Sequence, residues 1–211
     1  MEVVFKIFSI VILSYLVGSI PTAVWVSKYF FGIDIREYGS GNAGATNTFR
    51  TLGKRSGMAV MIVDMLKGFA AINLAFLSVY AFKSEQFINL QIALGIAAVV
   101  GHIFPIFAGF RGGKGVATLF GMILGIQPLV ALILVGVFVF MLFLTRYVSL
   151  SSIAASIAFP VMILFILKEP EDFYRLFAIA TACMVVLSHH KNISRLINGN
   201  ENKVSLKKKR K

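Results

Sequence analysis

The chain has 211 residues, of which 58% are hydrophobic and only 14% are charged, and its formal net charge is +12. Apolar surface in this amount exceeds what one small soluble core can bury, which excludes a soluble globular protein. The apolar runs are about 20 residues long and show no strand alternation, so the composition predicts an all-α integral membrane protein and not a β-barrel.

Seven apolar segments are expected to form transmembrane helices, some of them short. They are residues 3–27, 57–80, 87–108, 115–127, 129–145, 150–167 and 173–189. The first lacks the cleavage pattern of a signal peptide, so we expect it to stay in the mature protein. The run from Val116 to Leu144 is too long for one comfortable span, and Gln127 with Pro128 predicts a break within it.

Charge favours seven spans over six. With seven, the segments 27–57, 109–115, 145–150 and 188–211 lie on one side and carry 16 of the 21 Lys and Arg residues. The positive-inside rule makes this side cytoplasmic, so the N-terminus lies outside and the C-terminus in the cytoplasm. We therefore expect one polytopic domain over residues 1–200 and a basic cytoplasmic tail over 201–211. Topology and contact with anionic lipids account for the +12 charge, so no nucleic-acid partner is expected.

The first polar cluster extends from Glu37 to Arg50 and combines glycines with the hydrogen-bonding side chains of Ser40, Asn42, Thr46 and Asn47. Glycine allows left-handed turns and a close approach of backbone amides to an anion. An ordinary flexible loop is the simpler reading of the glycines alone. The four polar side chains, followed by an arginine suited to bidentate phosphate contact, favour a phosphate-binding loop.

The second cluster leads from Gly101 to Thr118 and contains Arg111, Gly112, Gly113, Lys114 and Gly115. This glycine-rich stretch lies between two predicted helices, so its amides and the N-terminus of the next helix favour an anion beside Lys114. The spacing does not match a Walker A loop, which argues against nucleotide hydrolysis.

The third cluster begins at His189, directly after the last apolar run. His189, Asn192 and Arg195 recur at helical spacing and are expected to face one pocket. Ser149 and Ser152 follow the fifth predicted span and add hydroxyls on the same side of the membrane. That serine-rich stretch is equally compatible with a helix cap.

Charged residues within the spans form a separate group. Asp64 and Lys67 are three residues apart inside the second span, where charge is costly, so we expect them to pair inside the bundle and to organise the pocket. His102, near a helix end, is assigned to the same pocket-organising group, with a structural role as the alternative. The histidines and acids form no convincing metal site. Cys183 lies in an apolar run and is expected to be a small core residue.

These motifs resemble those of the bacterial acyl-phosphate:glycerol-3-phosphate acyltransferases, a family of multi-pass membrane enzymes. The similarity lies in Gly39-Ser-Gly-Asn-Ala-Gly-Ala-Thr-Asn47 with Arg50, in Gly101-His-Ile-Phe-Pro105 followed by Gly112-Gly-Lys-Gly-Val-Ala-Thr118, in Asp64-Met-Leu-Lys-Gly68, and in the stretch from His189 to Glu201. The motifs occur in order, and the resemblance takes in nearly the whole chain.

The resemblance implies transfer of a fatty acyl group from a long-chain acyl phosphate to the 1-hydroxyl of glycerol 3-phosphate. The products are lysophosphatidic acid and inorganic phosphate, no cofactor is required, and the reaction starts phospholipid synthesis. It also implies a bacterial cell (inner) membrane location with the active site on the cytoplasmic side. A soluble enzyme that supplies the acyl phosphate is compatible with this reading.

The implied roles divide the site residues into two groups. The catalytic group is Ser40, Asn42, His189 and Asn192, and the substrate-binding group is Asn47, Arg50, Arg111, Gly112, Gly113, Lys114, Gly115, Ser149, Ser152 and Glu201. In the family the second motif is associated with glycerol 3-phosphate. Either His189 or the substrate's own phosphate could take the hydroxyl proton.

A membrane transporter of a phosphate-bearing anion or lipid is the competing interpretation. It predicts polar residues along a path to the outer face. The predicted outer loops, near residues 83–85, 127–128 and 168–172, contain little from which to build a second gate.

Overall fold

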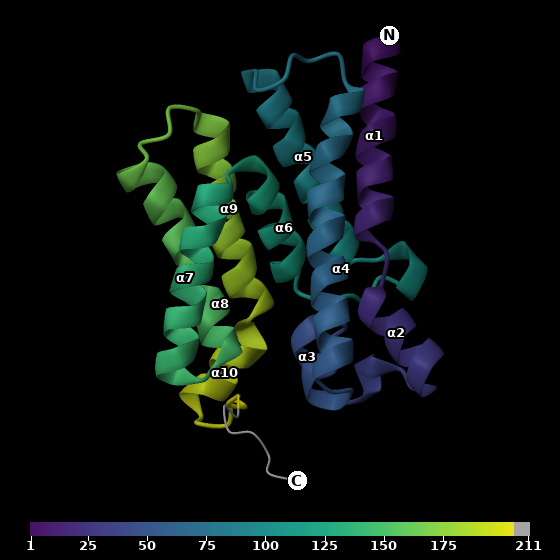
Figure 1. Cartoon of the computed structure of the whole chain (residues 1–211), viewed down its shortest axis with the longest axis vertical. Helices are drawn as coiled ribbons and strands as arrows, with labels where there is room; N and C mark the ends of the chain where they lie inside the picture. Colours follow the sequence, from purple (N-terminus) through teal and green to yellow (C-terminus); the bar gives the residue numbers. More distant parts are fainter. Residues whose placement is uncertain (205–211) are drawn as a thin grey trace. The chain divides into compact units, whose positions relative to one another are not determined.

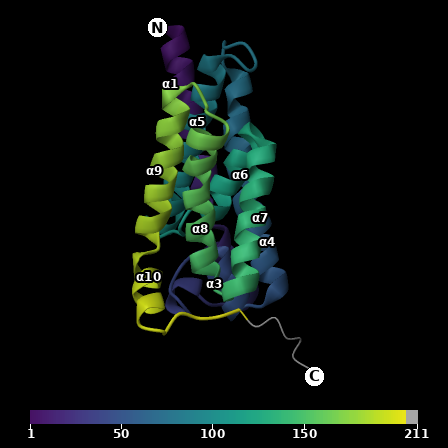
Figure 2. The same cartoon turned by 90° about the vertical axis from the view of Figure 1, so that its left-hand side faces the viewer.

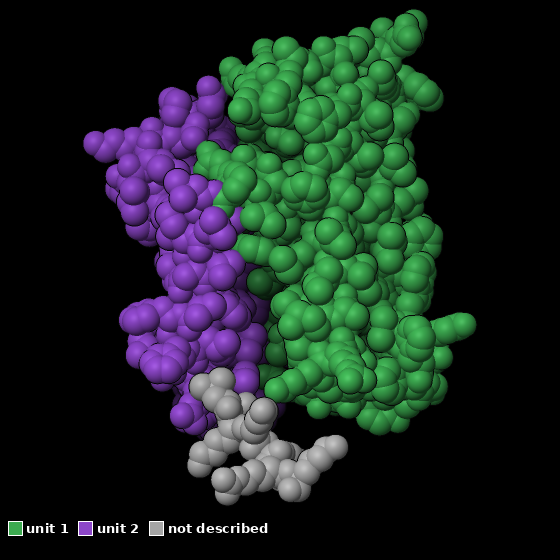
Figure 3. Space-filling view, viewed as in Figure 1, with its two compact units in different colours: residues 1–128 green, residues 129–211 purple. Residues whose placement is uncertain are grey.

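The computed structural model describes residues 1–204, which contain ten α-helices, four short helical turns and no strand. The predicted all-α class is thus confirmed for the described part of the chain. The helices form two compact units, residues 1–128 and residues 129 onward, which are coloured separately in Figure 3.

Unit 1 contains six α-helices, which Figure 1 labels in chain order. They are α1 (Glu2–Gly18), α2 (Thr22–Phe31), α3 (Ala45–Thr51), α4 (Lys54–Asn73), α5 (Glu85–Ile103) and α6 (Val116–Ile126), with the short turns η1 (Ile35–Glu37), η2 (Leu74–Leu77) and η3 (Ile106–Ala108) between them. Helix α4 packs on α6, and α1 packs on α5. The backbones of α4 and α6 approach closely at Gly68 and Gly121, where a Cβ would overlap backbone atoms of the facing helix.

The first apolar segment is divided between two helices, which the sequence interpretation had treated as one. Helix α1 ends at Gly18 and α2 begins at Thr22, on either side of Pro21. Proline has no amide hydrogen and disfavours a helical residue before it, so the helical ladder stops here. The break leaves the carbonyl of Ile20 as an acceptor for the Lys67 ammonium, 2.9 Å away.

Unit 2 contains α7 (Pro128–Thr145), which starts at the unit boundary, α8 (Val148–Val161), the π-helical turn η4 (Met162–Ile166), α9 (Asp172–Ser188) and α10 (His190–Ile197). Helices α8 and α9 pack side by side, as Figure 2 shows. Pro160 lies inside α8 directly before the π turn, which is a common place for a helix to change its geometry. Helix α10 is bent 59° from α9 at His189.

All seven predicted spans coincide with helical segments, and Gln127 separates α6 from α7 as predicted. Among residues 1–204, five segments are long and apolar enough to cross a membrane, and the α9–α10 pair makes a sixth if counted as one span. Helix α6 has 11 residues, about 16 Å, and so falls short of the roughly 30 Å hydrocarbon layer. The predicted basic tail lies outside the described residues from position 205 onward.

The expectation for Cys183 is wrong, because its side chain is exposed on α9. An apolar run predicts burial only in a soluble protein. In a membrane helix, the outer face is apolar as well because it contacts lipid.

Candidate active site

The first two polar clusters lie in the half of unit 1 that is away from the N-terminus (Figure 1). Asn47, on α3, organises the first cluster. Its side-chain amide donates to the carbonyls of Ile35 and Tyr38 at 3.1 and 2.9 Å, and its Oδ1 accepts from the Ser40 amide at 2.9 Å. Asn47 is buried, so it holds the loop from inside by three hydrogen bonds.

An ion pair that the sequence interpretation did not single out lies at the start of the same loop. Arg36 donates from Nε and Nη2 to the two oxygens of Asp34, at 2.9 and 2.7 Å, and from Nη1 to the carbonyl of Ala108 at 2.7 Å. The hydrogen bonds from Arg36 hold the pKa of Asp34 well below its usual range, and the same pairing raises the pKa of Arg36. The Asp-x-Arg spacing was the available sequence signal.

The second cluster folds back on the end of α5. The amides of Gly112 and Gly113 donate to the carbonyls of Ile103 and His102, both at 3.1 Å. A Cβ at Gly113 would overlap the His102 ring and would lie 3.1 Å from the carbonyl oxygen of Ala43 in the first cluster. Only glycine fits this approach, so the two clusters, far apart in sequence, meet at Gly113.

The α6 helix starts directly after this contact. Gly115 is its N-cap residue with a φ of 79°, a left-handed conformation that favours glycine. The first amides of α6 are therefore presented beside Lys114, which is half-buried. Arg111 is exposed before the turn. This is the arrangement that the sequence predicts for an anion site.

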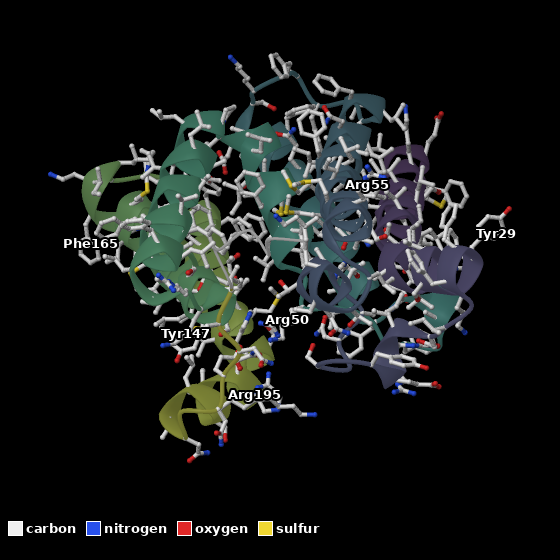
Figure 4. All side chains as sticks on the ribbon, turned by 60° about the horizontal axis from the view of Figure 1, so that its bottom comes forward. Tyr29, Arg50, Arg55, Tyr147, Phe165 and Arg195 are labelled. Atoms are coloured by element: carbon white, nitrogen blue, oxygen red, sulfur yellow. The ribbon has the colours of Figure 1, made fainter. Side chains whose placement is uncertain are left out.

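The predicted polar side chains of the first cluster differ in exposure. Ser40 is exposed, and Asn42 is half-buried between the glycines. Arg50 is exposed on the last turn of α3, at the end of unit 1 that Figure 4 brings forward.

Charged residues inside unit 1 form a buried group. Asp64 Oδ1 lies 2.9 Å from Lys67 Nζ, and both side chains are almost fully buried, so the predicted pairing is confirmed. The imidazole of His102 lies 3.7 Å from the same carboxylate oxygen through Nδ1. Because the other nitrogen of His102 faces Gly113, this ring connects the buried pair to the second cluster.

In unit 2, the carboxylate of Glu201 is the shared hydrogen-bond acceptor of three other polar side chains. Glu201 Oε1 accepts from Ser149 Oγ at 2.9 Å and from Asn192 Nδ2 at 2.8 Å, and Oε2 accepts from Arg195 Nε at 2.8 Å. Figure 4 labels Arg195 on α10 and Tyr147 before α8. Burial raises the pKa of Glu201, but the hydrogen bonds from these three residues outweigh it and leave the pKa lowered.

His189 lies at the bend between α9 and α10 and is buried. Its Nδ1 is 2.8 Å from the carbonyl of Val185, and because a carbonyl can only accept, Nδ1 donates. A neutral ring then has Nε2 as its acceptor nitrogen. Ser152 instead donates to the Val148 carbonyl within α8 and is not among the Glu201 partners.

No group of His, Cys, Asp and Glu residues within positions 1–204 is arranged to hold a metal ion. The arrangement found in unit 1 is two glycine-rich loops, a helix N-terminus and nearby cations. It can bind phosphate groups, while buried side chains fix the loops.

A family model described as glycerol-3-phosphate acyltransferase matches residues 8–199 of this chain. The chain belongs to this family. A glycerol-3-phosphate acyltransferase of Chlorobium phaeobacteroides (strain BS1) is 43% identical over 95% of this chain and 97% of that protein. Its counterpart from Fusobacterium nucleatum is 44% identical over 93% of this chain and 97% of its own length.

Solved structures agree with the sequence comparisons. The crystal structure of PlsY (YgiH), an integral membrane glycerol 3-phosphate acyltransferase, in its glycerol 3-phosphate form is 37% identical and has a TM-score of 0.83, covering 94% of this chain and 96% of that one. The lysophosphatidic acid form has a TM-score of 0.80 at the same identity. The predicted family, a multi-pass membrane acyltransferase, is thus confirmed.

Proposed function

We propose that this protein transfers a fatty acyl group from a long-chain acyl phosphate to the 1-hydroxyl of glycerol 3-phosphate. The products are lysophosphatidic acid and inorganic phosphate. The observation that carries this assignment is the meeting of the two glycine-rich clusters at Gly113, beside Lys114 and the N-terminus of α6. Relatives with the same name, and a PlsY structure in forms with this substrate and this product, support it.

Phosphate recognition is assigned to unit 1. Arg50 and Lys114 supply the positive charge, with Arg111 as an exposed third cation, while the amides of Gly115 and of the first turn of α6 supply directed donors. Gly112 and Gly113 are assigned to shape the turn, because their own amides donate to the carbonyls of Ile103 and His102. Asn47 shapes this site through its three backbone hydrogen bonds, which leaves Ser40 and Asn42 as the side chains assigned to orient substrate oxygens.

The chemistry is an acyl substitution. The hydroxyl oxygen of glycerol 3-phosphate attacks the carbonyl carbon of the acyl phosphate, the bond between that carbon and the phosphate oxygen breaks, and phosphate leaves with the electron pair. The hydroxyl proton passes to His189 Nε2 or to a substrate phosphate oxygen. Holding two phosphate-bearing substrates in register supplies much of the acceleration, because both reactants lose their freedom on binding and not during the reaction.

The roles in unit 2 follow from its hydrogen bonds. Asn192 is assigned to orient substrate oxygens, and Glu201 supports it, because the carboxylate already accepts three hydrogen bonds and would repel a phosphate. Ser149 belongs to the same support. Ser152 donates a hydrogen bond within its own helix, and its contact with substrate stays a prediction.

The membrane topology proposed here has seven spans, with the N-terminus outside and the basic segments at the cytoplasmic face of a bacterial inner membrane. Residues 1–200 then act as one catalytic domain. The short α6 is counted as a span because, without it, the basic tail would lie outside while the basic first loop stayed inside. The variants Lys83→Cys and Lys203→Cys, labelled with a thiol reagent in intact cells and in opened vesicles, would test this orientation.

The direct test supplies the purified protein, in lipid, with palmitoyl phosphate and glycerol 3-phosphate. We expect inorganic phosphate release that requires both substrates and yields lysophosphatidic acid, with no product when acyl-CoA is the donor. Product from acyl-CoA alone would contradict the donor assignment, and no product from either donor would contradict the proposed reaction.

Lys114→Ala and Arg50→Ala test the assignment of phosphate binding. Each should reduce kcat/KM by about a hundredfold or more, the size of effect seen when one directed donor of a developing charge is removed. Lys54→Ala, an exposed lysine at the start of α4, is the matched control and should leave turnover near wild type. Near-normal turnover in both test variants would rule out these two residues as the phosphate contacts.

A further inference from the structure

Arg36 connects two segments that the function requires to be in register, although it belongs to neither glycine-rich motif. It lies in η1, and its side chain is mostly buried. Besides its 2.7 Å hydrogen bond to the carbonyl of Ala108, its Nη1 lies 3.5 Å from the carbonyl of Arg111. Both carbonyls belong to the turn that leads into Lys114.

Asp34 fixes the direction in which the guanidinium points. Both of its oxygens accept from Arg36, and Oδ1 also accepts from the Arg36 backbone amide at 3.1 Å. Lys28 Nζ lies 3.2 Å from Oδ2. A planar guanidinium held by two parallel hydrogen bonds can rotate little, so its third nitrogen is directed at one place.

The turn that Arg36 contacts has an uncommon backbone. Gly109 and Phe110 follow each other with φ values of 62° and 59°. A left-handed phenylalanine is disfavoured by its Cβ, so the turn needs contacts that hold it in this form. The Phe110 amide donates to the carbonyl of Pro105 at 2.9 Å, and Arg36 supplies the contact from outside the turn.

We propose that Arg36 is a positioning residue for the recognition of glycerol 3-phosphate, acting through the turn 108–111. By tying this turn to η1, it sets the position of Arg111 and Lys114 against the loop that Asn47 organises. It does not itself contact the reacting atoms. This inference rests on the proposed function.

The competing role for a cation at this position is simple electrostatic attraction of phosphate. Two substitutions distinguish electrostatic attraction from positioning of the turn. Asp34→Asn keeps the charge of Arg36 and removes a negative charge, so attraction alone predicts equal or better use of glycerol 3-phosphate. Arg36→Lys keeps the charge but cannot reproduce the fork to Asp34 together with the contact to Ala108.

The experiment measures steady-state kinetics of the full-length variants Arg36→Ala, Arg36→Lys and Asp34→Asn in lipid, varying glycerol 3-phosphate and palmitoyl phosphate separately. We expect KM for glycerol 3-phosphate to rise about tenfold in all three, the effect of losing one charge-assisted hydrogen bond. The KM for palmitoyl phosphate should change much less. Arg55→Ala, which removes an exposed arginine of the same unit, is the control and should behave as wild type.

The possible results either support or overturn the positioning role of Arg36. An unchanged KM for glycerol 3-phosphate in Arg36→Ala would overturn the proposal, as would an effect that Arg36→Lys and Asp34→Asn do not share. If none of the three variants is recovered as folded protein by size-exclusion chromatography, Arg36 is a folding residue and the proposal fails. Absence of activity in the wild type would instead refute the proposed function.

Discussion

Asp64 in unit 1 and Glu201 in unit 2 are both buried carboxylates, 1% and 6% exposed, but their charges are balanced differently. Asp64 has one charged neighbour, Lys67, which is itself 4% exposed, with the His102 ring farther away. Glu201 accepts from two neutral donors and from Arg195, whose side chain is about one third exposed. Removal of the carboxylate therefore strands a buried cation in unit 1 but only a partly solvated one in unit 2.

The largest expected effect follows from separating the buried pair. Asp64→Leu should destabilise the protein by about 3 to 5 kcal/mol, because an unpaired ammonium would remain inside the bundle. Lys67→Leu should have a comparable effect. The double variant should be more stable than either single one, since it buries no charge.

Thermal unfolding in detergent would measure this cycle. If the losses of the two single variants simply add in the double variant, Asp64 and Lys67 do not depend on each other, and the comparison with Glu201 loses its basis. Lys54→Leu, at an exposed position of the same helix, is the control for the change in composition.

A smaller effect is expected in unit 2. Glu201→Gln keeps an oxygen that can accept from Ser149 and Asn192 but loses the charged partner of Arg195. The expected loss is about 1.5 to 3 kcal/mol, typical of a hydrogen bond to a charged group. The control is Asp172→Asn, an exposed residue paired with Arg175 in the same unit, where about 0 to 1 kcal/mol is expected.

The measurement is again the unfolding midpoint, with lysophosphatidic acid production recorded on the same samples. A loss in Glu201→Gln no larger than that in Asp172→Asn would mean that the three hydrogen bonds contribute no more than a surface pair. Activity lost without any loss of stability would instead favour the substrate-binding role that the sequence suggested for Glu201.

The sequence predicted best what depends on a single segment. Apolar length predicted the helical segments, Gln127 and Pro128 predicted the break before α7, and the spacing of Asp64 and Lys67 predicted their pairing. The division of the first segment at Pro21 was missed because the apolar run continues across it, and hydropathy does not report backbone geometry.

What the sequence could not give are contacts between distant segments. The hydrogen bond from Arg36 to the carbonyl of Ala108 is not apparent from the sequence, because every residue has a backbone carbonyl. The sequence also does not show that the side chains of Ser149, Asn192 and Arg195 share Glu201 as their acceptor, because that depends on how the chain folds back after α10. The approach of Gly113 to His102 belongs to the same class. Cys183 failed for a different reason, because an apolar residue in a membrane helix can face either the core or lipid.

Gly113→Ala tests the link that His102 makes between the buried pair of Asp64 and Lys67 and the second glycine-rich cluster. The added methyl would overlap the His102 ring, so that ring or the loop must shift. We expect a stability loss of about 1 to 2 kcal/mol and a raised KM for glycerol 3-phosphate. Gly136→Ala, where a Cβ meets nothing within 4 Å, is the matched control. Unchanged kinetics in Gly113→Ala would mean that this glycine only turns the chain.

The smallest effect is the pH dependence of Glu201. Because its pKa is lowered in the folded protein, the ionised form binds its partners better than the protonated form does. The stability that it contributes is fully present above the ordinary glutamate pKa, about 4.3, and is lost as the pH falls through the lower value in the folded state. The difference in midpoint between wild type and Glu201→Gln should therefore be constant from about pH 7 to about pH 5 and should narrow by about pH 3.5. A difference that widened on acidification would mean that the protonated carboxyl is the better partner, and the assignment of Arg195 as a charged donor to Glu201 would be wrong.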